Sequence, residues 1–393
     1  MSQLNQEFAR QQRIAYVGFT QQNTKVLASL GKMSPNLTQY VPIAISEKLQ
    51  LIFRLLLPLK VHQILATRTY VPSGKLAKKK YYPAATLLVP LIWRFSISPR
   101  FSTLILFLSK RSLVKFLKKI YSKNDVVILP SDYLNLLQND FLPKTILEIR
   151  WHHSSANQKR IAPLLGYPIA LENSPTDWER TFSQACNSLL GCVVYSEFAL
   201  ESFVDFGYPR TMFCVVGLEA PKPSVEVGFL NSTMTRKGFM HIGRGPLDKG
   251  LDIAVHLAKE SKENLSVIGS YSEEVIEWLN TFEHVNYLGV LSRSEIYLLM
   301  ISHEVYLATG VESFGFAVLE ALENGLKVVG SQSVGVLERY GSDPNVFIAA
   351  NLTLDSYENA TRLALNSGKL TKFQIVDLQI SESWDAVVNR WLN

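Results

Sequence analysis

The sequence predicts an α/β protein built from two doubly wound domains that face a central cleft. Short apolar runs alternate with helical patterns of about ten residues in both halves, which is typical of parallel sheets covered by helices. The alternation stops at 218–234, a stretch with two prolines, and then restarts. The length of 393 residues fits two or three domains of about 150 residues each. We therefore expect a domain at 1–217, a linker at 218–234 and a second domain at 235–378.

In the first half of the chain, the alternation of strands and helices is less regular. A short strand running into a loop is expected at 13–19, and a helical segment is expected at 42–70. A basic loop at 71–82 precedes an apolar segment and a basic amphipathic helix within 102–122. Buried strands are predicted at 125–130, 145–150, 192–196 and 214–217, with a helix that ends at Phe206 before the turn Gly207-Tyr208-Pro209.

The second half carries the clearer pattern, in which strand and helix alternate without a break. Strands are predicted at 238–242, 265–269, 285–288 and 304–308. Helices are predicted at 249–260, 271–281, 293–302 and 316–324. Ligands of such folds sit beyond the carboxyl ends of the strands, so the loops that follow these strands are where we expect a site.

Composition narrows the class of protein. Hydrophobic residues make up 47% and charged residues 19% of the chain, which argues against disorder. Cys186, Cys192 and Cys214 lack the close spacing of metal ligands, so reduced core thiols are expected. The first residues are polar and contain no apolar signal segment, and no apolar run reaches the 18–20 residues that span a bilayer. A cytoplasmic protein is therefore expected.

Charge is unevenly distributed along the chain. Residues 48–124 contain 16 Lys and Arg and no Asp or Glu, while the formal net charge of the whole chain is +6. Basic and apolar side chains interleave at 110–123, which favours contact with an anionic membrane surface. A helix that faces the core and presents a basic outer side explains the same pattern. Nucleic acid is not expected as a partner, because the sequence contains no known module that binds it.

A glycine-containing turn follows the predicted strand 238–242. It reads Gly243-Arg244-Gly245-Pro246-Leu247-Asp248-Lys249-Gly250 and leads into a helix. Glycine lets the backbone approach a ligand, and the helix N-terminus attracts anions. Arg244 and Lys249 add two positive charges at the same point, so the turn is suited to phosphate. An ordinary turn with two solvated basic side chains is the alternative, since the spacing matches neither a P-loop nor G-x-G-x-x-G.

Two glutamates eight positions apart mark the second motif, VESFGFAVLEALENG at 311–325. Glu312 lies in the loop after strand 304–308, and Glu320 lies inside the following helix. Residues 313–315 form the turn between strand and helix, with free N–H groups at the helix start. Carboxylates accept several hydrogen bonds, so this arrangement suits a ligand rich in hydroxyl groups. Alternatively, Glu320 and Glu323 are a solvated face and Glu312 a loop charge.

Together these motifs resemble the C-terminal domain of GT-B glycosyltransferases, specifically the retaining family-4-like group (glycosyl transferases group 1). That group carries F-x-x-x-G-R…K-G and E-x7-E segments, which match GRGPLDKG and ESFGFAVLE here. The resemblance covers roughly 185–393 and is weak over the first 140 residues. It implies a GT-B fold of two Rossmann-like domains, in which a final helix at 379–393 crosses back to the first domain.

The resemblance also implies roles for individual residues. Glu312 would hold the hydroxyls of a donor sugar, and Glu320 would bind the ribose of the nucleotide. A histidine after a strand of the first domain would lie near that sugar, and His152 and His153 are both candidates. The remaining expected contacts are Gly243, Arg244 and Lys249 to the diphosphate, Ser313, Phe314 and Gly315 to the sugar, and Gly289 and Val290 to the base.

The implied reaction moves a sugar from a nucleoside diphosphate to an acceptor hydroxyl, with retention of configuration. The sequence lacks the Asp-x-Asp motif of metal-dependent enzymes, so no metal or cofactor is expected, and Arg, Lys and helix dipoles would stabilise the leaving diphosphate. The first domain would bind the acceptor, a saccharide or lipid-linked saccharide, in the synthesis of a surface polysaccharide or glycolipid at the inner face of the cell membrane. The base, the sugar and the linkage stay open.

Three departures from the family pattern keep other functions open. Thr309-Gly310-Val311 replaces a usual Pro-Ser, Lys327 replaces a proline, and the loop after the first strand lacks paired glycines. A GT-B-like binding or scaffold protein without turnover is one alternative. A nucleotide-sugar epimerase or a phosphorylase of the same architecture is the other.

Overall fold

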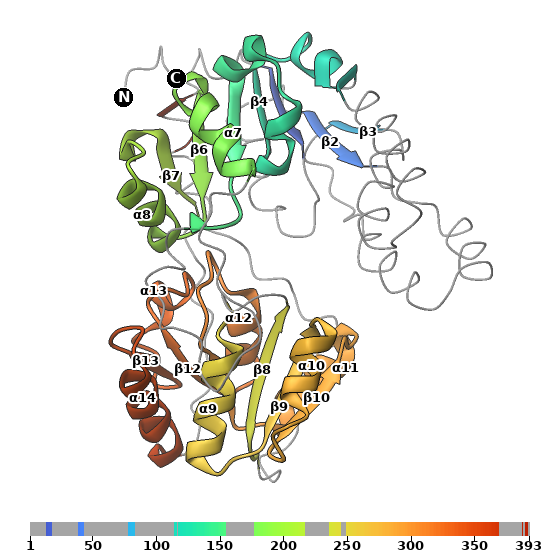
Figure 1. Ribbon diagram of the computed structural model, residues 1–393. Helices are drawn as coiled ribbons and strands as arrows, with labels where there is room; N and C mark the ends of the chain where they lie inside the picture. The colour runs from blue at the N-terminus through green and yellow to red at the C-terminus, as the bar shows by residue number, and fades with distance from the viewer. Residues whose placement is uncertain are drawn as a thin grey trace, which may run out of the picture.

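The computed structural model shows two parallel β-sheets, one above the other in Figure 1, each flanked by helices. It describes residues 13–17, 38–42, 78–82, 114–154 except 116, 177–216, 236–244, 249–368, 387 and 390–391. The expected α/β architecture of two doubly wound domains is confirmed, because all strand pairs in both sheets are parallel.

The first sheet has seven strands in the order β3-β2-β1-β4-β5-β6-β7. Its central strands are short apolar runs that are buried along their whole length, as expected for a sheet covered on both faces. The strands are β1 (Ile14–Val17), β2 (Thr38–Pro42), β3 (Lys78–Tyr82), β4 (Val126–Pro130), β5 (Thr145–Glu148), β6 (Gly191–Val194) and β7 (Phe213–Val215).

Helices α7 (Asp177–Ala185) and α8 (Glu197–Phe206) pack on this sheet, together with short 3-10 turns at Ser131–Leu136, Asn139–Lys144, Cys186–Ser188 and Arg210–Met212. The Ser196 hydroxyl caps α8 by accepting a hydrogen bond from the Ala199 N–H. Gly207 ends the helix in the left-handed region, with φ 114°. The predicted helix that ends at Phe206 is therefore confirmed.

The basic loop expected at 71–82 is wrong in its second part, because Lys78–Tyr82 is strand β3. It pairs in parallel with β2, from Thr38 opposite Lys78 to Pro42 opposite Tyr82. Among the described strands, β3 lies at the edge of the first sheet. The helical segment expected at 42–70 lies outside the described residues, apart from Pro42.

The basic amphipathic helix is present, but its apolar side faces the core. Residues 114, 115 and 117–121 are helical. Leu117, Ile120 and Tyr121 are buried in the same core cluster as β4 and β5, whereas Lys118 and Lys119 are exposed. This side is therefore not available for insertion into a bilayer. In the described part of the chain, no helix is long and apolar enough to cross a membrane.

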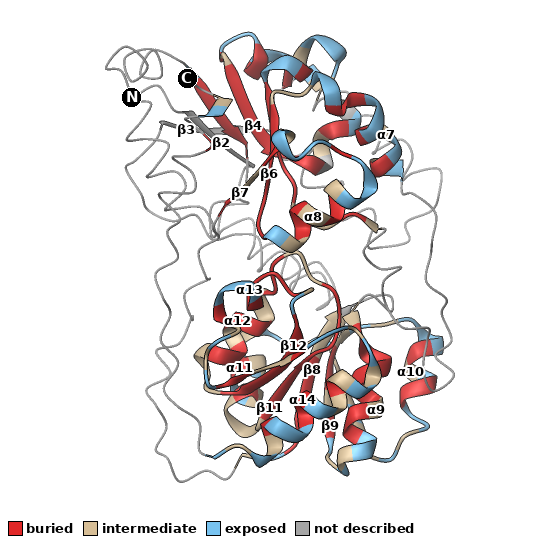
Figure 2. Cartoon of the chain, turned by 90° about the vertical axis from the view of Figure 1, so that its left-hand side faces the viewer, coloured by how far each residue is buried: buried red, intermediate tan, exposed pale blue. Residues whose placement is uncertain are grey.

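The second sheet has six strands in the order β10-β9-β8-β11-β12-β13. Figure 2 shows its strands as the buried centre between helices. The strands are β8 (Phe239–Arg244), β9 (Leu265–Ser270), β10 (Val285–Gly289), β11 (Val305–Ala308), β12 (Lys327–Ser331) and β13 (Val346–Ala349), and the helices are α9 (Leu251–Ser261), α10 (Glu273–Leu279), α11 (Arg293–Ser302), α12 (Phe316–Glu323), α13 (Leu337–Tyr340) and α14 (Leu354–Asn366). The predicted alternation of strands and helices from 238 to 324 is confirmed.

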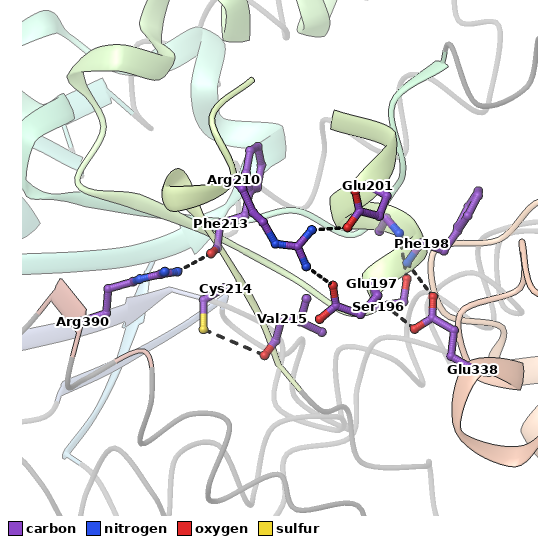
Figure 3. Close-up of polar contacts among 11 residues, drawn as sticks. Ser196, Glu197, Phe198, Glu201, Arg210, Phe213, Cys214, Val215, Glu338 and Arg390 are labelled. Carbon is purple, nitrogen blue, oxygen red and sulfur yellow. Dashed lines mark hydrogen bonds and ion pairs between the residues drawn. The ribbon is translucent and has the colours of Figure 1, made fainter. Parts of the chain in front are cut away.

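The end of the chain contacts the first sheet. Val387 is fully buried, and the Arg390 guanidinium donates to the carbonyl of Phe213 in β7 (Figure 3). The Trp391 ring lies against Gly191 in β6, since a Cβ there would stand 2.3 Å from the ring. Glycine at 191 therefore leaves room for this indole. Residues 387, 390 and 391 are helical, and the domain boundaries themselves stay a prediction.

Candidate functional site

Close packing at Gly250 brings the loops after β8 and β11 together. Gly250 has φ 73°, and a Cβ at this position would lie 2.4 Å from the carbonyl of Thr309. The Thr309 hydroxyl donates to the Gly250 carbonyl at 2.6 Å. Because only glycine fits this contact, the backbone that carries Lys249 lies directly against the backbone that leads to Glu312.

Lys249 and Glu312 form the centre of the site. Lys249 Nζ lies 3.3 Å from Glu312 Oε1, and both side chains are about one quarter exposed. The β-carbon of Lys249 also lies next to Gly243 at the end of β8. The two sequence motifs, about 60 residues apart, thus meet at the carboxyl edge of the second sheet. Arg244 ends β8, and its side chain lies outside the described residues.

Residues 313–315 form the turn that starts α12. Gly315 takes the N-cap position with φ 99°, where a Cβ would lie 2.8 Å from Val334. Phe314 is buried and packs on Phe316, with ring centres 4.7 Å apart. This packing leaves the N-terminus of α12 beside Glu312, and such a terminus favours an anionic or electron-rich ligand group.

Glu320 pairs with an arginine that the sequence reading had not selected. Arg293 Nη2 of α11 donates to Glu320 Oε1 at 2.8 Å. Burial raises the pKa of Glu320, and the positive charge of Arg293 opposes this rise. Burial raises the pKa of Tyr306 in β11, and the negative charges of Glu312 and Glu320 raise it further. Both carboxylates therefore lie close enough to interact electrostatically with the same buried hydroxyl.

Gly289 and Val290 form the loop between β10 and α11. Gly289 ends β10 with φ 68°, and Val290 is 52% exposed. Leu288 and Leu291 on either side pack against the core cluster that contains Leu319 of α12. The loop is thus held beside the α11–α12 pair and presents an exposed apolar side chain there.

The two histidines have different surroundings. His153 is 1% exposed, and its ring stacks on Phe206 at 3.9 Å within the first core. Burial lowers its pKa, and Glu179, 3.6 Å from Nε2, opposes this. His152 is only partly buried and packs near Phe198 at the start of α8, with ring centres 5.5 Å apart.

Hydrogen bonds join the two halves of the chain beside these residues. The Ser313 hydroxyl donates to the Arg150 carbonyl at 2.6 Å, and the Ser196 hydroxyl donates to the Ser313 carbonyl at 2.5 Å. Glu338 of α13 accepts from the backbone N–H groups of Glu197 and Phe198 at 3.0 and 2.5 Å, at the N-terminus of α8 (Figure 3). The turn that carries Glu312 therefore touches the segment that carries His152.

A buried network under this contact was missed by the sequence reading. Glu148, which is 1% exposed, accepts hydrogen bonds from the hydroxyls of Tyr16 and Tyr195 and from Arg150. A glutamate inside the apolar run TILEIR was the available signal, because a buried carboxylate requires partners. The network holds Arg150 at the carboxyl edge of the first sheet.

Metal ligands are not gathered in the described part of the chain. None of its groups of His, Cys, Asp and Glu side chains has the three members that could hold a metal ion. The three cysteines are free, and burial raises the pKa of each thiol.

Two doubly wound domains with parallel sheets are the architecture of the GT-B fold. Residues 228–374 match the model of the family Glycosyl transferases group 1. The match covers the second sheet and all the candidate residues from Gly243 to Glu320. No curated protein matches the sequence.

Solved structures show the same fold over nearly the whole chain. One is HepE (Alr3699) of Anabaena, in complex with UDP and glucose, at 11% identity and a TM-score of 0.51, covering 97% of this chain and 95% of that one. Another is a sucrose-phosphate synthase (tll1590) of Thermosynechococcus elongatus, at 12% identity and a TM-score of 0.53, covering 98% of this chain and 95% of that one. The expected GT-B fold is therefore confirmed.

Proposed function

We propose that this protein transfers a sugar from a nucleoside diphosphate sugar to an acceptor hydroxyl, with retention of configuration and without a metal. The observation that carries the proposal is the ion pair of Lys249 with Glu312 beside the N-terminus of α12, in a domain that matches the model of the glycosyl transferases group 1 family. A cation, a carboxylate and free N–H groups in one place suit a ligand with both phosphate and hydroxyl groups.

In this proposal, each of the candidate residues contacts a different part of the donor. Lys249, with Arg244, binds the diphosphate and stabilises it as it leaves. Glu312 accepts hydrogen bonds from the sugar hydroxyls, and the turn at 313–315 supports it. Glu320 accepts hydrogen bonds from the ribose, while the loop at Gly289 and Val290 lies against the base.

His152, and not His153, is the proposed histidine near the donor sugar. It follows β5, is partly exposed, and lies next to the segment that touches Ser313. His153 is enclosed by aromatic rings and supports the first core. With no nucleophilic side chain assigned, the acceptor attacks from the side on which the diphosphate leaves, and a phosphate oxygen takes its proton.

The acceptor in this proposal is a saccharide or lipid-linked saccharide, bound by the first domain at the cytoplasmic face of the membrane. Support comes from the basic stretch 48–124, whose described part exposes Lys115, Lys118 and Lys119 on one helix side. Lysines near an anionic surface contribute about 1 kcal/mol each to attraction. Contact would be electrostatic, since the apolar side of this helix is in the core.

Binding of nucleotides tests the proposal first. The purified protein is titrated with UDP, GDP, ADP and CMP, beside the double variant Arg244→Ala/Lys249→Ala. We expect one nucleoside diphosphate to bind tightly and the double variant to lose this binding without a change in melting temperature. The corresponding nucleotide sugars are then screened for transfer. Absence of binding to all four would instead favour a scaffold without turnover.

A further inference from the structure

Arg293 is held in place before any ligand binds. It is the first residue of α11, whose start is fixed by a capping box between Ser292 and Glu295. Its Nε and Nη2 atoms lie 2.9 and 2.7 Å from the hydroxyl of Tyr297 one turn later, and its guanidinium carbon lies 5.3 Å from the centre of that ring. The remaining freedom of this side chain is small, so its direction is set by α11.

The guanidinium points at one oxygen of Glu320. Nη2 lies 2.8 Å from Oε1 of this carboxylate, which is 17% exposed, while the arginine side chain is 38% exposed. Tyr297 hydrogen-bonds the same carboxylate, so two groups of α11 engage Glu320. An arginine that occupies one oxygen orients the plane of the carboxylate and preserves its acceptor character.

A second carboxylate stands one turn away on α12. Glu323 Oε2 is buried and has no hydrogen-bond partner within the described residues. Burial, followed by the charge of Glu320, raises the pKa of Glu323 to about 7, and Arg293 lowers it. Two carboxylates that share one arginine cannot both ionise readily, so near neutral pH a proton on Glu323 leaves Glu320 charged.

We infer that Arg293 is a positioning residue that holds Glu320 as an oriented, charged acceptor for the vicinal hydroxyls of a ribonucleotide. The inference rests on the proposed donor site. It adds that preference for ribose over deoxyribose depends on Arg293, a residue that touches the carboxylate and not the nucleotide. Without Arg293, burial favours the protonated form of Glu320, which is a poorer acceptor.

The groups that face Glu320 determine how this preference changes with pH. They are Arg293 and Tyr297 from α11, Glu323 from its own helix and Tyr306 from β11. Of these, Glu323 is the group with a pKa near neutrality. Without the positive charge of Arg293, burial leaves the pKa of Glu320 further raised, so we expect a lost ribose preference to return as the pH rises.

The test compares two ligands and several variants. The nucleoside diphosphate that binds wild type most tightly and its 2′-deoxy form are titrated by calorimetry at pH 6, 7 and 8.5. The variants are Arg293→Met, Arg293→Lys, Arg293→Met/Glu323→Gln and, as a control, Arg362→Met, which changes an exposed arginine of α14. Melting temperatures are recorded for each variant.

Wild type and Arg362→Met are expected to prefer the ribonucleotide about tenfold or more. Arg293→Met should lose this preference at pH 7, bind the deoxy form as wild type does, and regain preference at pH 8.5. Arg293→Met/Glu323→Gln should behave as Arg293→Met at pH 7, because without the arginine Glu323 is already protonated there. Arg293→Lys should keep part of it, because a lysine keeps the charge without the planar fork.

Two results overturn the inference while leaving the donor site intact. The first is that Arg293→Met keeps the wild-type preference for the ribonucleotide at every pH. The second is that Arg293→Met loses affinity equally for both nucleotides and does not recover it at pH 8.5, which indicates a structural role. If Arg293→Met does not fold, Arg293→Lys with unchanged preference overturns it as well. Failure of wild type to bind any nucleotide is different, because it overturns the proposed function and this inference with it.

Discussion

Lys249 Nζ lies 3.3 Å from Glu312 Oε1, and this contact joins the loops that follow β8 and β11. Replacing Lys249 with alanine removes a charge-assisted contact worth about 1.5–3 kcal/mol to a charged ligand. We expect nucleoside diphosphate affinity to fall about tenfold or more, measured by calorimetry. Lys259→Ala changes an exposed lysine on the adjacent α9 and should leave affinity unchanged. Equal affinities of the two variants would contradict the proposed role of Lys249.

Alanine variants of the two histidines should separate their roles. His153→Ala removes a buried ring stacked on Phe206, so we expect destabilisation of about 2–4 kcal/mol in urea unfolding. His152→Ala should keep the wild-type stability and lose sugar transfer, because His152 is partly exposed beside the donor turn. A His152→Ala variant with full transfer activity would remove this residue from the mechanism.

Glu148 is expected to be essential for the first domain. Glu148→Ala leaves Arg150 and two tyrosine hydroxyls without their partner, which costs about 3–5 kcal/mol when one member of a buried pair is removed. Urea unfolding measures the loss. Glu201→Ala breaks an exposed pair with Arg210 and should change the midpoint far less. Similar midpoints for the two variants would show that the Glu148 network contributes little.

A methyl group at Gly335 is predicted to disturb the junction of the two halves. A Cβ there would lie 2.4 Å from the Ser313 carbonyl and 2.5 Å from Ser196. Because these atoms belong to the contact between the donor turn and α8, we expect Gly335→Ala to lower the rate of transfer. Gly368→Ala, with no atom near the added carbon, is the matched control. Kinetics of transfer for both variants provide the measurement, and equal rates would refute the prediction.

Stability should depend on pH through Glu323. Its pKa in the folded protein is raised to about 7 from 4.5, so the folded state binds the proton more tightly than the unfolded state. This contribution is complete below about pH 4.5 and is lost as the pH rises through about 7. The Glu323→Gln variant has no carboxyl group to titrate and does not lose this stability. The melting temperature of the variant, relative to that of wild type, should therefore rise between pH 5 and pH 8. A constant difference across that range would argue against a buried, titrating Glu323.

The second half was predictable because its signals are local. The strand and helix pattern from Phe239 to Leu322 follows from apolar periodicity, and Gly250 and Gly315 mark positions that need a positive φ. Because Glu312 follows a parallel strand in the sequence, it is expected at the carboxyl edge of the sheet. The same reasoning was wrong at Lys78–Tyr82. The charged and turn-forming residues there suggested a loop, but the segment pairs with β2 and forms a strand.

The sequence by itself determined the α/β class, the order of elements in the second half, and the two motifs that carry Lys249, Glu312 and Glu320. Tertiary structure decided which side chains are partners. It placed Arg293 on Glu320, enclosed His153 while leaving His152 partly exposed, and surrounded Glu148 with Tyr16, Tyr195 and Arg150. The physical reason is that periodicity acts over a few residues. Pairing between Arg293 and Glu320, or between Tyr195 and Glu148, depends on which strands become neighbours in the folded sheets.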